Sequence, residues 1–305
     1  MDTSPPVCIA CGASSPQRFF EASDWYLGAV GGTFSYVRCT SCGTVMIAPQ
    51  PSERVLRASY AESYAPFNAR PGIVERLGER LAQREASHLA SLVEPSRAVL
   101  DVGCGTGRFL ERLRRAGWRG PMSGIEPAPD VAADAARRLG VRVKTGSIED
   151  MDVAEGSIGT VVLRHVIEHL RDPREALARV RHVLEPGGFA YVATPDARAL
   201  AAKVFGRYWH GYDPPRHLFA FTRDGLRTLL GGEGFEVVDE RWFFAPQMWT
   251  GSLRHALGRG RRPKWVAIAG SEFNPLAAGP AVVGATLEVG LHRSTMYAVT
   301  ARRPS

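Results

Sequence analysis

The chain contains 305 residues, of which 45% are hydrophobic and 23% are charged. This balance supports a sizeable buried core and excludes an intrinsically disordered protein. The formal net charge is +7 and comes almost entirely from Arg rather than Lys. It is explained either by a general preference for Arg or by an anionic partner such as a phosphate, a carboxylate or a nucleic acid.

The sequence gives no sign of export or membrane insertion. The opening residues, MDTSPPVCIACG, contain no apolar segment of the kind found in signal peptides. The apolar stretch from Trp265 to Leu291 is interrupted by charged residues and prolines, which makes it a poor membrane span. Cysteines in a chain without an export signal favour a reducing compartment, where paired cysteines bind metal more often than they form disulfides. We therefore expect a cytoplasmic protein without a membrane span.

Residues 1–50 are predicted to form a zinc-ribbon module. Two C-x-x-C pairs are each followed by Gly, and the two intervening residues let both thiolates of a pair reach one metal ion. Gly supplies the positive φ that such a turn requires. The alternative of four unrelated thiols does not explain the repeated pattern. Trp25 and Tyr26 lie in the long spacer, which forms either an extra hairpin or a loop over the active site. The predicted ligands of a structural zinc ion are Cys8, Cys11, Cys39 and Cys42.

Residues 51–95 are predicted to form a helical connector that caps one side of the next domain. Apolar side chains recur there at helical spacing and end at Pro95. Tyr60 and Tyr64 precede the main helix and are interpreted either as packing aromatics or as residues that fold over a ligand. The side chains expected on the buried face are Leu77, Leu81, Ala82, His88, Leu89 and Leu92.

Residues 96–305 alternate between short apolar segments and segments of helical spacing. This alternation predicts a parallel sheet with helices on both faces, and a ligand at the carboxyl ends of the strands. The last strand, within 294–304, is expected to be antiparallel. Strands are expected at 98–103, 120–127, 141–150 (with a turn), 159–166, 188–196 and 235–244. Helices are expected at 107–117, 130–140, 172–184, 197–206, 222–234 and 245–258, with a further helix in the apolar stretch.

The stretch VLDVGCGTGRFL, residues 99–110, has the pattern of a buried strand, a tight glycine turn and a helix start. Glycines let the backbone turn sharply and approach a ligand closely, and the N–H groups of the helix start favour an anionic or polar group. A dinucleotide fingerprint needs a glycine where this chain has Arg108. Glu126 ends the next strand, where a carboxylate can accept both hydroxyls of a ribose. The pattern therefore favours a ribose-containing cofactor other than a dinucleotide.

Five motifs occur in order: LDVGCGTGRFL, GIEP, GSIED, LRHVIEHLRDP and LEPGGFAYVATPD. They resemble those of class I S-adenosylmethionine-dependent methyltransferases, and within that class the bacterial small-molecule branch. The resemblance covers about residues 96–245. It implies a Rossmann-like, doubly wound α/β fold with a mostly parallel sheet and an antiparallel final strand.

The resemblance also implies S-adenosylmethionine as the cofactor. Asp101 and the backbone of the glycine turn would hold its methionine part, and Glu126 would bind its ribose. Residues 147–149 would surround the adenine, and residues 163–166 would line the pocket floor beside the methyl group. Cys104 is interpreted as a small apolar residue within the turn. The predicted cofactor-binding residues are Asp101, Gly103, Cys104, Gly105, Gly107, Glu126, Ser147, Ile148, Glu149, Arg164 and His165.

Glu168 and His169 follow the fourth strand of the predicted domain. The resemblance implies a structural pair that holds the following loop. The alternative is a divalent metal site formed together with His165, as in relatives that methylate quinone precursors.

Two segments, 197–220 and 246–291, are predicted to bind the acceptor or to form a lid. In the first, Pro214-Pro215 is expected to hold the backbone extended, and Arg216 to bind an acidic group of the acceptor. The second is expected to form a lid or an apolar pocket. Thr222 is the expected N-cap of the next helix. The candidate catalytic residues are His217 as general base, with His210 and Tyr212 behind it; a structural hydrogen bond is the alternative role of His217.

The leading hypothesis is an S-adenosylmethionine-dependent methyltransferase that acts on a sugar, a secondary-metabolite intermediate or a lipid precursor. A zinc module joined to this domain also resembles the sugar C-methyltransferases of deoxysugar pathways, although their histidine-rich carboxy-terminal motif is absent. One alternative is a zinc-ribbon RNA methyltransferase, but the ribbon has no basic-aromatic stripe, so nucleic acid is not the expected partner. The other alternative is a non-catalytic zinc-ribbon adaptor. The sequence leaves open whether the chain forms a homodimer.

Overall fold

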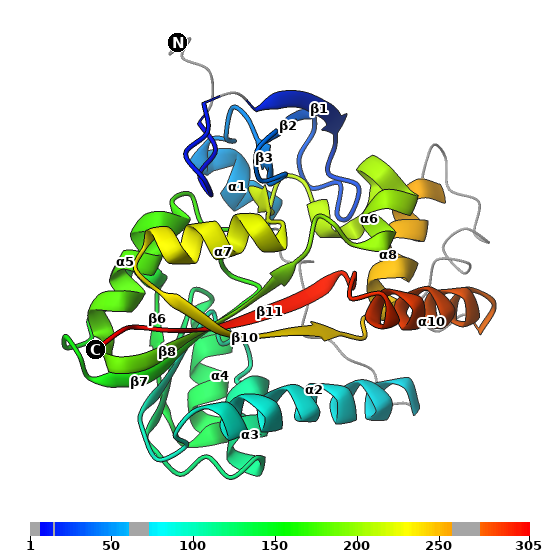
Figure 1. Cartoon of the computed structure of the whole chain (residues 1–305). Helices are drawn as coiled ribbons and strands as arrows, with labels where there is room; N and C mark the ends of the chain where they lie inside the picture. Colours follow the sequence, from blue (N-terminus) through cyan, green and yellow to red (C-terminus); the bar gives the residue numbers. More distant parts are fainter. Residues whose placement is uncertain (1–6, 15, 61–72, 258–274) are drawn as a thin grey trace. The chain divides into compact units, whose positions relative to one another are not determined.

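The computed structural model describes residues 7–14, 16–60, 73–257 and 275–305 (Figure 1). Two predicted features lie outside the described residues: Tyr64, and the part of the expected lid between 258 and 274, which includes Trp265. The chain divides into two compact units. Unit 1 comprises Met1–Tyr64, Thr194–Leu229 and Arg241–Tyr297, and unit 2 comprises Ala65–Ala193, Leu230–Glu240 and Ala298–Ser305.

A four-stranded antiparallel sheet lies in unit 1, with the strand order β1-β2-β3-β9. Its outer strand β9 lies far along the chain, after the last parallel strand. Val45 and Met46 of β3 pair with Ala220 and Phe219 of β9. The predicted ribbon is thus completed by residues far away in sequence. The strands are β1 (Gln17–Ala22), β2 (Phe34–Arg38), β3 (Val45–Ile47) and β9 (Phe219–Ala220).

Unit 1 also contains most of the helices that follow the parallel domain, and α8 packs on α6 and α10 there. The expected helix 197–206 is shorter than predicted: it begins at Leu200 and ends at Phe205, after which short 3-10 turns follow. The helical elements are α1 (Glu53–Ser59), α6 (Leu200–Phe205), η2 (Gly206–Tyr208), η3 (His210–Tyr212), α8 (Pro246–Leu257) and α10 (Pro275–Gly290); α7 (Arg223–Gly232) starts in unit 1 and ends in unit 2.

One seven-stranded sheet has the order β10-β11-β8-β7-β4-β5-β6. Strands β8, β7, β4, β5 and β6 run parallel. Strand β11 runs antiparallel to β8, because Gly187 N donates to Arg303 O and Arg303 N donates to Gly188 O. The predicted fold class is therefore confirmed. The strands are β4 (Val99–Val102), β5 (Met122–Glu126), β6 (Arg142–Thr145), β7 (Ile158–Arg164), β8 (Leu184–Pro195), β10 (Glu236–Phe243) and β11 (Met296–Arg302).

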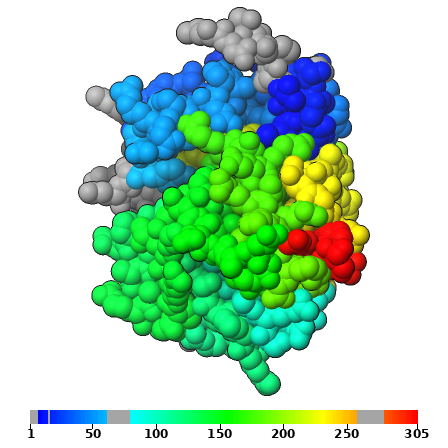
Figure 2. Space-filling model, turned by 90° about the vertical axis from the view of Figure 1, so that its left-hand side faces the viewer, coloured from blue at the N-terminus to red at the C-terminus, as the bar shows by residue number. Residues whose placement is uncertain are grey.

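Helices cover both faces of the sheet in unit 2. Figure 1 shows α2, α3 and α4 on one side and α5 on the other. The buried side chains of β4 and of Ile158–Leu163 in β7 form the centre of this core. The last residues of the chain, red in Figure 2, lie at the surface of this unit, where Arg303 donates to the carbonyl of Arg181. The helical elements are α2 (Ile73–Leu92), α3 (Arg108–Arg115), α4 (Pro129–Leu139), η1 (Ile148–Asp150) and α5 (Pro173–Val183).

Two local predictions are wrong. The buried face of α2 does not include Leu92, which is 37% exposed, but does include Glu85, which is 7% exposed. The backbone at Pro214-Pro215 is not extended, because the N–H groups of Arg216 and His217 both donate to the carbonyl of Asp213 and close a turn. A buried ion pair between residues distant in sequence lies at each place: Glu85 pairs with Arg164, and Arg216 pairs with Asp24.

Candidate functional site

The glycine turn connects β4 to α3 as predicted. Gly103, Gly105 and Gly107 have φ values of 69°, 54° and 73°, in the left-handed region that favours glycine. A Cβ at Gly103 would lie 2.6 Å from Val166 Cγ2, and a Cβ at Gly107 would lie 2.3 Å from Leu139 Cδ1. Backbone conformation and packing therefore both require glycine at 103 and 107, and backbone conformation favours it at 105.

The carboxylate of Glu126, at the carboxyl end of β5, is fixed against this turn. Its Oε2 accepts a hydrogen bond from Gly105 N at 2.9 Å, and its Oε1 accepts one from Ala128 N at 3.0 Å. The residue is 7% exposed. Each carboxylate oxygen has two lone pairs, so each can accept one further hydrogen bond. Two neighbouring hydroxyls, such as those of a ribose, fit this pair of acceptors.

Asp101 lies in β4 and is 2% exposed. Burial raises the pKa of its carboxyl to about 7; Arg164 opposes this shift, whereas Glu126 and Glu85 add to it. A cation close to Asp101 would favour its charged form. An ammonium group fits such a position, and the cofactor-binding role of Asp101 stays a prediction.

Arg164, at the end of β7, forms a bidentate ion pair with Glu85 of α2, at 2.7 and 2.9 Å. Tyr191 Oη donates to the same carboxylate at 2.9 Å. The guanidinium carbon lies 4.5 Å from the ring centroid of Phe109, the second residue of α3. Burial acts to raise the pKa of Glu85, but the charge and hydrogen bonds of Arg164 outweigh burial and hold this pKa below its ordinary value. Glu85 was not among the predicted site residues, because its only signal in the sequence is a carboxylate on an otherwise apolar helix face.

The predicted adenine segment forms η1. The backbone N–H and the hydroxyl of Ser147 both donate to Asp150 Oδ2, each at 2.9 Å. Ile148 is 1% exposed, whereas Glu149 is exposed. Asp150, which the sequence analysis did not single out, therefore fixes the conformation of this segment.

Cys104 and His165 occupy different environments in unit 2. Cys104 is 8% exposed, and burial raises the pKa of its thiol, so it stays neutral. His165 has φ 56°, and its Nδ1 lies 3.4 Å from Glu168 Oε1. Among the described residues, the ligand atoms of His165, Glu168 and His169 do not all come within 4.8 Å of one another. The structure therefore does not favour the alternative of a metal site formed by these three.

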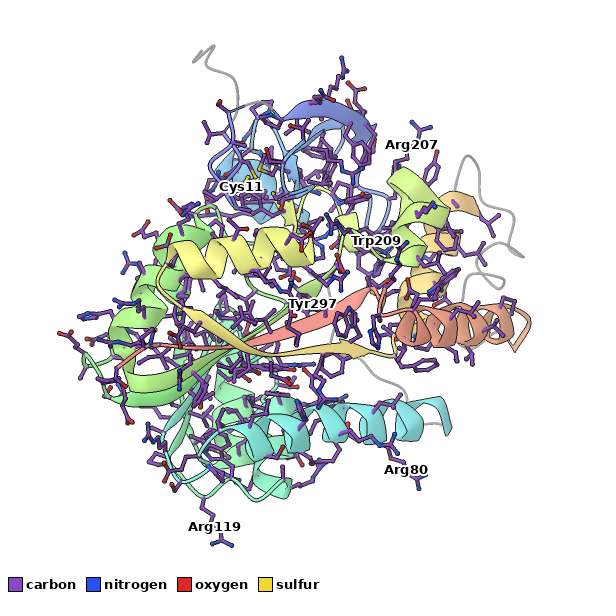
Figure 3. The ribbon with its side chains drawn as sticks, in the orientation of Figure 1. Cys11, Arg80, Arg119, Arg207, Trp209 and Tyr297 are labelled. Atoms are coloured by element: carbon purple, nitrogen blue, oxygen red, sulfur yellow. The ribbon has the colours of Figure 1, made fainter. Side chains whose placement is uncertain are left out.

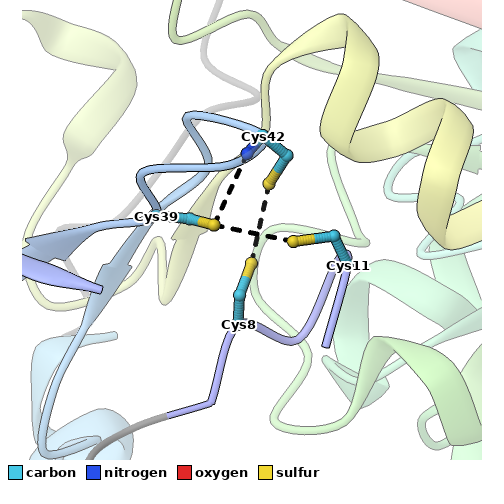
Figure 4. A group of neighbouring side chains, drawn as sticks. All are labelled: Cys8, Cys11, Cys39 and Cys42. Atoms are coloured by element: carbon cyan, nitrogen blue, oxygen red, sulfur yellow. Dashed lines mark hydrogen bonds between the residues drawn. The ribbon is translucent and has the colours of Figure 1, made fainter. Parts of the chain in front are cut away.

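The four predicted zinc ligands converge in unit 1, and Figure 4 shows their sulfurs turned toward one another. The Sγ–Sγ distances are 3.6 Å for Cys8 and Cys42 and 3.5 Å for Cys11 and Cys39. Four sulfurs at about 2.3 Å from a central zinc ion would lie about 3.8 Å apart. The sulfurs are therefore close to the spacing of a closed tetrahedral zinc site.

The second cysteine pair packs against the start of α7. Thr222 Oγ1 accepts a hydrogen bond from Gly225 N at 3.0 Å and donates one to Cys42 O at 2.6 Å. A Cβ at Gly225 would lie 2.1 Å from Thr44 Oγ1. The predicted N-cap role of Thr222 is confirmed, and the same hydroxyl ties the cysteine turn to the helix.

The three candidate catalytic residues lie in unit 1. Tyr212 is 3% exposed and packs against Phe20 and Trp209, and burial raises the pKa of its phenol. His217 Nδ1 lies 2.8 Å from Gly211 O. Because a carbonyl only accepts, Nδ1 carries the proton and Nε2 of the neutral ring has the lone pair that a base requires. Burial lowers the pKa of His210 to about 4.

Arg216 does not bind an acceptor in the way predicted from the sequence. Its side chain is fully buried, donates to Asp24 Oδ1 and Asp213 Oδ1 at 2.7 Å each, and donates to Ser59 O at 3.0 Å. Two carboxylates therefore neutralise this guanidinium inside unit 1. Other arginines, including Arg80 and Arg207, point away from the protein body in Figure 3, as solvated arginines do.

A glycine turn after the first parallel strand, an acid at the end of the second and an antiparallel strand inserted beside β8 define the class I methyltransferase fold. The family model described as "Methyltransferase domain" matches residues 70–240. The chain therefore belongs to this family, and it is an S-adenosylmethionine-dependent methyltransferase.

Among curated proteins, the chain is similar to a malonyl-[acyl-carrier protein] O-methyltransferase of Serratia marcescens, with 26% identity over 62% of this chain and 71% of the relative. It is 30% identical to a ubiquinone biosynthesis O-methyltransferase of Azorhizobium caulinodans, over 51% of this chain and 66% of the relative. An uncharacterized 37.1 kDa protein in transposon TN4556 of Streptomyces fradiae is 36% identical over 35% of this chain, and only 32% of that relative's length is covered.

Among solved structures, the chain is similar to a 1,6-didemethyltoxoflavin-N1-methyltransferase of Burkholderia thailandensis with S-adenosylhomocysteine bound. The TM-score is 0.53, the identity is 17%, and 95% of this chain and all of that chain (100%) are covered. The [4+2]-cyclase SpnF gives a TM-score of 0.52 at 21% identity, over 78% of this chain and 85% of that one. These likenesses show the fold. No described helix is long and apolar enough to cross a membrane.

Proposed function

We propose that this chain transfers the methyl group of S-adenosylmethionine to an oxygen atom of a small molecule: a sugar, a secondary-metabolite intermediate or a lipid precursor. The observation that carries the proposal is the buried Glu126 carboxylate, which the backbone of the glycine turn holds at the end of β5. The names of the two O-methyltransferases reported above support an oxygen atom as the methylated position.

Each predicted cofactor residue has a role in this proposal. Glu126 binds the two ribose hydroxyls, and Asp101 binds the ammonium group. The left-handed turn at Gly103, Gly105 and Gly107 lets the backbone approach the methionine part. Arg164 stacks on Phe109 at the end of β7 and keeps positive charge near Asp101. The backbone of Cys104 and His165 and the Ser147–Glu149 segment complete the set.

Bound S-adenosylmethionine supplies a methyl group that its sulfonium already activates. The protein then has to align the acceptor in line with the S–CH₃ bond and to exclude water. An acceptor hydroxyl also has to lose a proton. We assign this step to Nε2 of His217, because the hydrogen bond between Nδ1 and Gly211 O fixes the tautomer that has its lone pair on Nε2. The buried phenol of Tyr212 is a weaker candidate.

The four cysteines are proposed to hold one structural zinc ion. A site with four sulfur ligands is closed, so it has no position for a reacting group. Its role is to hold together the short strands β1–β3, of which β1 is mostly exposed. Reduced, metal-binding cysteines also support the cytoplasm as the location of the protein.

The proposed function is tested by incubating the purified chain with methyl-labelled S-adenosylmethionine and a panel of hydroxylated small molecules. Label transfer to one of them supports the proposal, and a His217→Gln variant should lose this transfer but still bind the cofactor. An RNA methyltransferase would instead show salt-dependent RNA binding and label in RNA. A non-catalytic adaptor would label none of these molecules and would keep its fold without the cofactor.

A further inference from the structure

Two histidines of unit 1 lie side by side, His210 in η3 and His255 in α8, with ring centroids 5.0 Å apart. His255 is 4% exposed. Neither of its ring nitrogens has a hydrogen-bond partner in the part of the chain that the structure describes, and the same is true of Nδ1 of His210. Buried polar atoms nearly always have partners, because leaving them without one destabilises the fold. Three such nitrogens in one place need hydrogen-bond partners from outside the described residues.

The two rings are held firmly by α8. The backbone N–H of His210 donates to Ser252 Oγ at 2.9 Å, and Ser252 Oγ in turn donates to Met248 O at 2.6 Å. A Cβ at Gly251 would lie 2.9 Å from Cγ of His210, so the helix backbone contacts this ring directly. The position of His210 is thus set by packing rather than by hydrogen bonds of its own ring nitrogens.

Aromatic side chains surround the pair. The ring of Tyr26 meets His210 and His255 edge-on, at centroid distances of 5.4 and 6.3 Å. Trp25 lies 6.5 Å from His255 and 4.7 Å from Tyr208. These aromatic rings lie beside the two histidines, and Arg254 lies over the ring of Tyr26 with its guanidinium carbon 5.7 Å from the centroid.

The loop that holds Trp25 and Tyr26 is fixed at its start by Asp24. The carboxylate of Asp24 accepts hydrogen bonds from the N–H groups of Leu27 and Ala29, at 3.2 and 2.8 Å. It also forms the buried ion pair with Arg216. The hydrogen bonds of Asp24 therefore hold in place the loop that carries Trp25 and Tyr26 beside the two histidines.

The chemistry of the pair restricts its ligand. Burial lowers the pKa of His210 to about 4 and that of His255 to about 3, so both rings are neutral at neutral pH. A neutral imidazole offers one N–H donor and one nitrogen acceptor, which a hydroxyl complements because it both donates and accepts. Arg216 is neutralised by two aspartates, the neighbouring Arg254 is exposed to solvent, and the described residues supply no third metal ligand close to the pair. A carboxylate, a phosphate or a metal ion therefore fits less well than a hydroxyl.

We propose that His210 and His255, with Trp25 and Tyr26, bind a neutral ring that carries hydroxyl groups. The aromatic side chains pack against the flat face of the ring, and the histidine nitrogens hydrogen-bond to its hydroxyls. We assign this ring to the methyl acceptor, a step that rests on the proposed function. His255 is a binding residue that the sequence analysis did not identify.

The experiment uses the full chain and two probes, catechol as a phenolic ring and methyl α-D-glucoside as a sugar ring. Calorimetry measures the binding of each probe and, separately, of S-adenosylmethionine to the wild type, His255→Leu, His255→Gln and the control His182→Gln. His182 lies on α5 with 60% of its side chain exposed. We expect one probe to bind the wild type and the control with similar affinity. The affinity of that probe should fall about tenfold for each hydrogen bond that His255→Leu or His255→Gln removes. Which probe binds distinguishes a phenolic from a sugar acceptor.

Thermal unfolding gives a readout that does not depend on the choice of probe. Leu has a volume close to that of His and no polar atoms, so His255→Leu should raise the Tm of the free protein by about 2 °C if the nitrogens have no protein partner. A fall in Tm for both His255→Leu and His255→Gln would show that the protein itself supplies the partners and would overturn the proposal. Binding of S-adenosylmethionine without binding of either probe would also overturn it and leave the proposed function standing. If S-adenosylmethionine fails to bind, the proposed function is wrong. The binding of catechol or methyl α-D-glucoside then still tests whether His210 and His255 bind a hydroxylated ring.

Discussion

Replacing Glu85 by Gln should strongly destabilise unit 2. Glu85 lies on α2 and was not predicted to be buried. The substitution keeps the shape of the side chain and removes its charge. Arg164 then loses both hydrogen bonds from its guanidinium to a carboxylate, at 2.7 and 2.9 Å, and Tyr191 Oη loses a charged acceptor. The Arg164 side chain is only 21% exposed, so water replaces the lost partner poorly.

The magnitude follows from the geometry. Removing one partner of a buried ion pair costs about 3–5 kcal/mol. We take about 3 kcal/mol, because the guanidinium is partly accessible and also lies over the ring of Phe109. For a domain of this size, that free energy corresponds to a fall in Tm of roughly 6–12 °C. Thermal unfolding followed by circular dichroism measures it.

Two controls separate a lost charge from a general effect of mutation. Glu94→Gln removes a carboxylate that pairs with Arg97 at the surface and should leave the Tm unchanged. The double variant Glu85→Leu with Arg164→Met removes both charges and should recover much of the lost stability, since apolar residues of similar volume can replace a buried pair. A Tm of Glu85→Gln within about 1 °C of the wild type would show that the charge of Glu85 contributes little to stability.

Three further predictions follow from the sites. The protein should contain one zinc ion per chain, and its removal with a chelator, or a Cys8→Ser substitution, should lower the Tm of unit 1; metal analysis with thermal unfolding checks this, and an unchanged Tm after complete removal would contradict it. The pKa of Asp101 is raised by burial, so its contribution to stability should be lost as the pH rises from about 4 to about 7, and Asp101→Asn should flatten this dependence in urea titrations at several pH values. His217→Gln should lower kcat at least tenfold with little change in cofactor affinity, whereas Tyr212→Phe should retain most turnover; equal kcat values for His217→Gln and the wild type would exclude His217 as the base.

The features that could be predicted from the sequence are those with local signals. The glycine turn and the cysteine pairs each depend on residue types at fixed short spacing, and the observed φ values of Gly103, Gly105 and Gly107 follow from that spacing. The alternation of apolar and amphipathic segments likewise predicts the parallel strands. Thr222 could be identified as an N-cap because capping also depends on neighbouring residues.

The features that could not be predicted depend on pairs far apart in the chain. Arg216 looked available for an acceptor because its partner Asp24 lies 192 positions away, in the spacer of the ribbon. Glu85 and Arg164 are separated by 79 positions, and no local pattern connects them. The pairing of His210 with His255 arises only when α8 packs against η3. Long-range packing thus decides which charged side chains remain open to ligands.

In the proposed function, the turn at residues 103–107 and the carboxylate of Glu126 bind S-adenosylmethionine. Calorimetric titration of the cofactor into the wild type and into Glu126→Gln tests it most directly, with Glu155→Gln as an exposed control. We expect one binding site per chain and an affinity that falls about 10–100-fold in Glu126→Gln, because charged hydrogen bonds worth about 1.5–3 kcal/mol are lost. Absence of binding to the wild type, or equal affinity for both proteins, would contradict it.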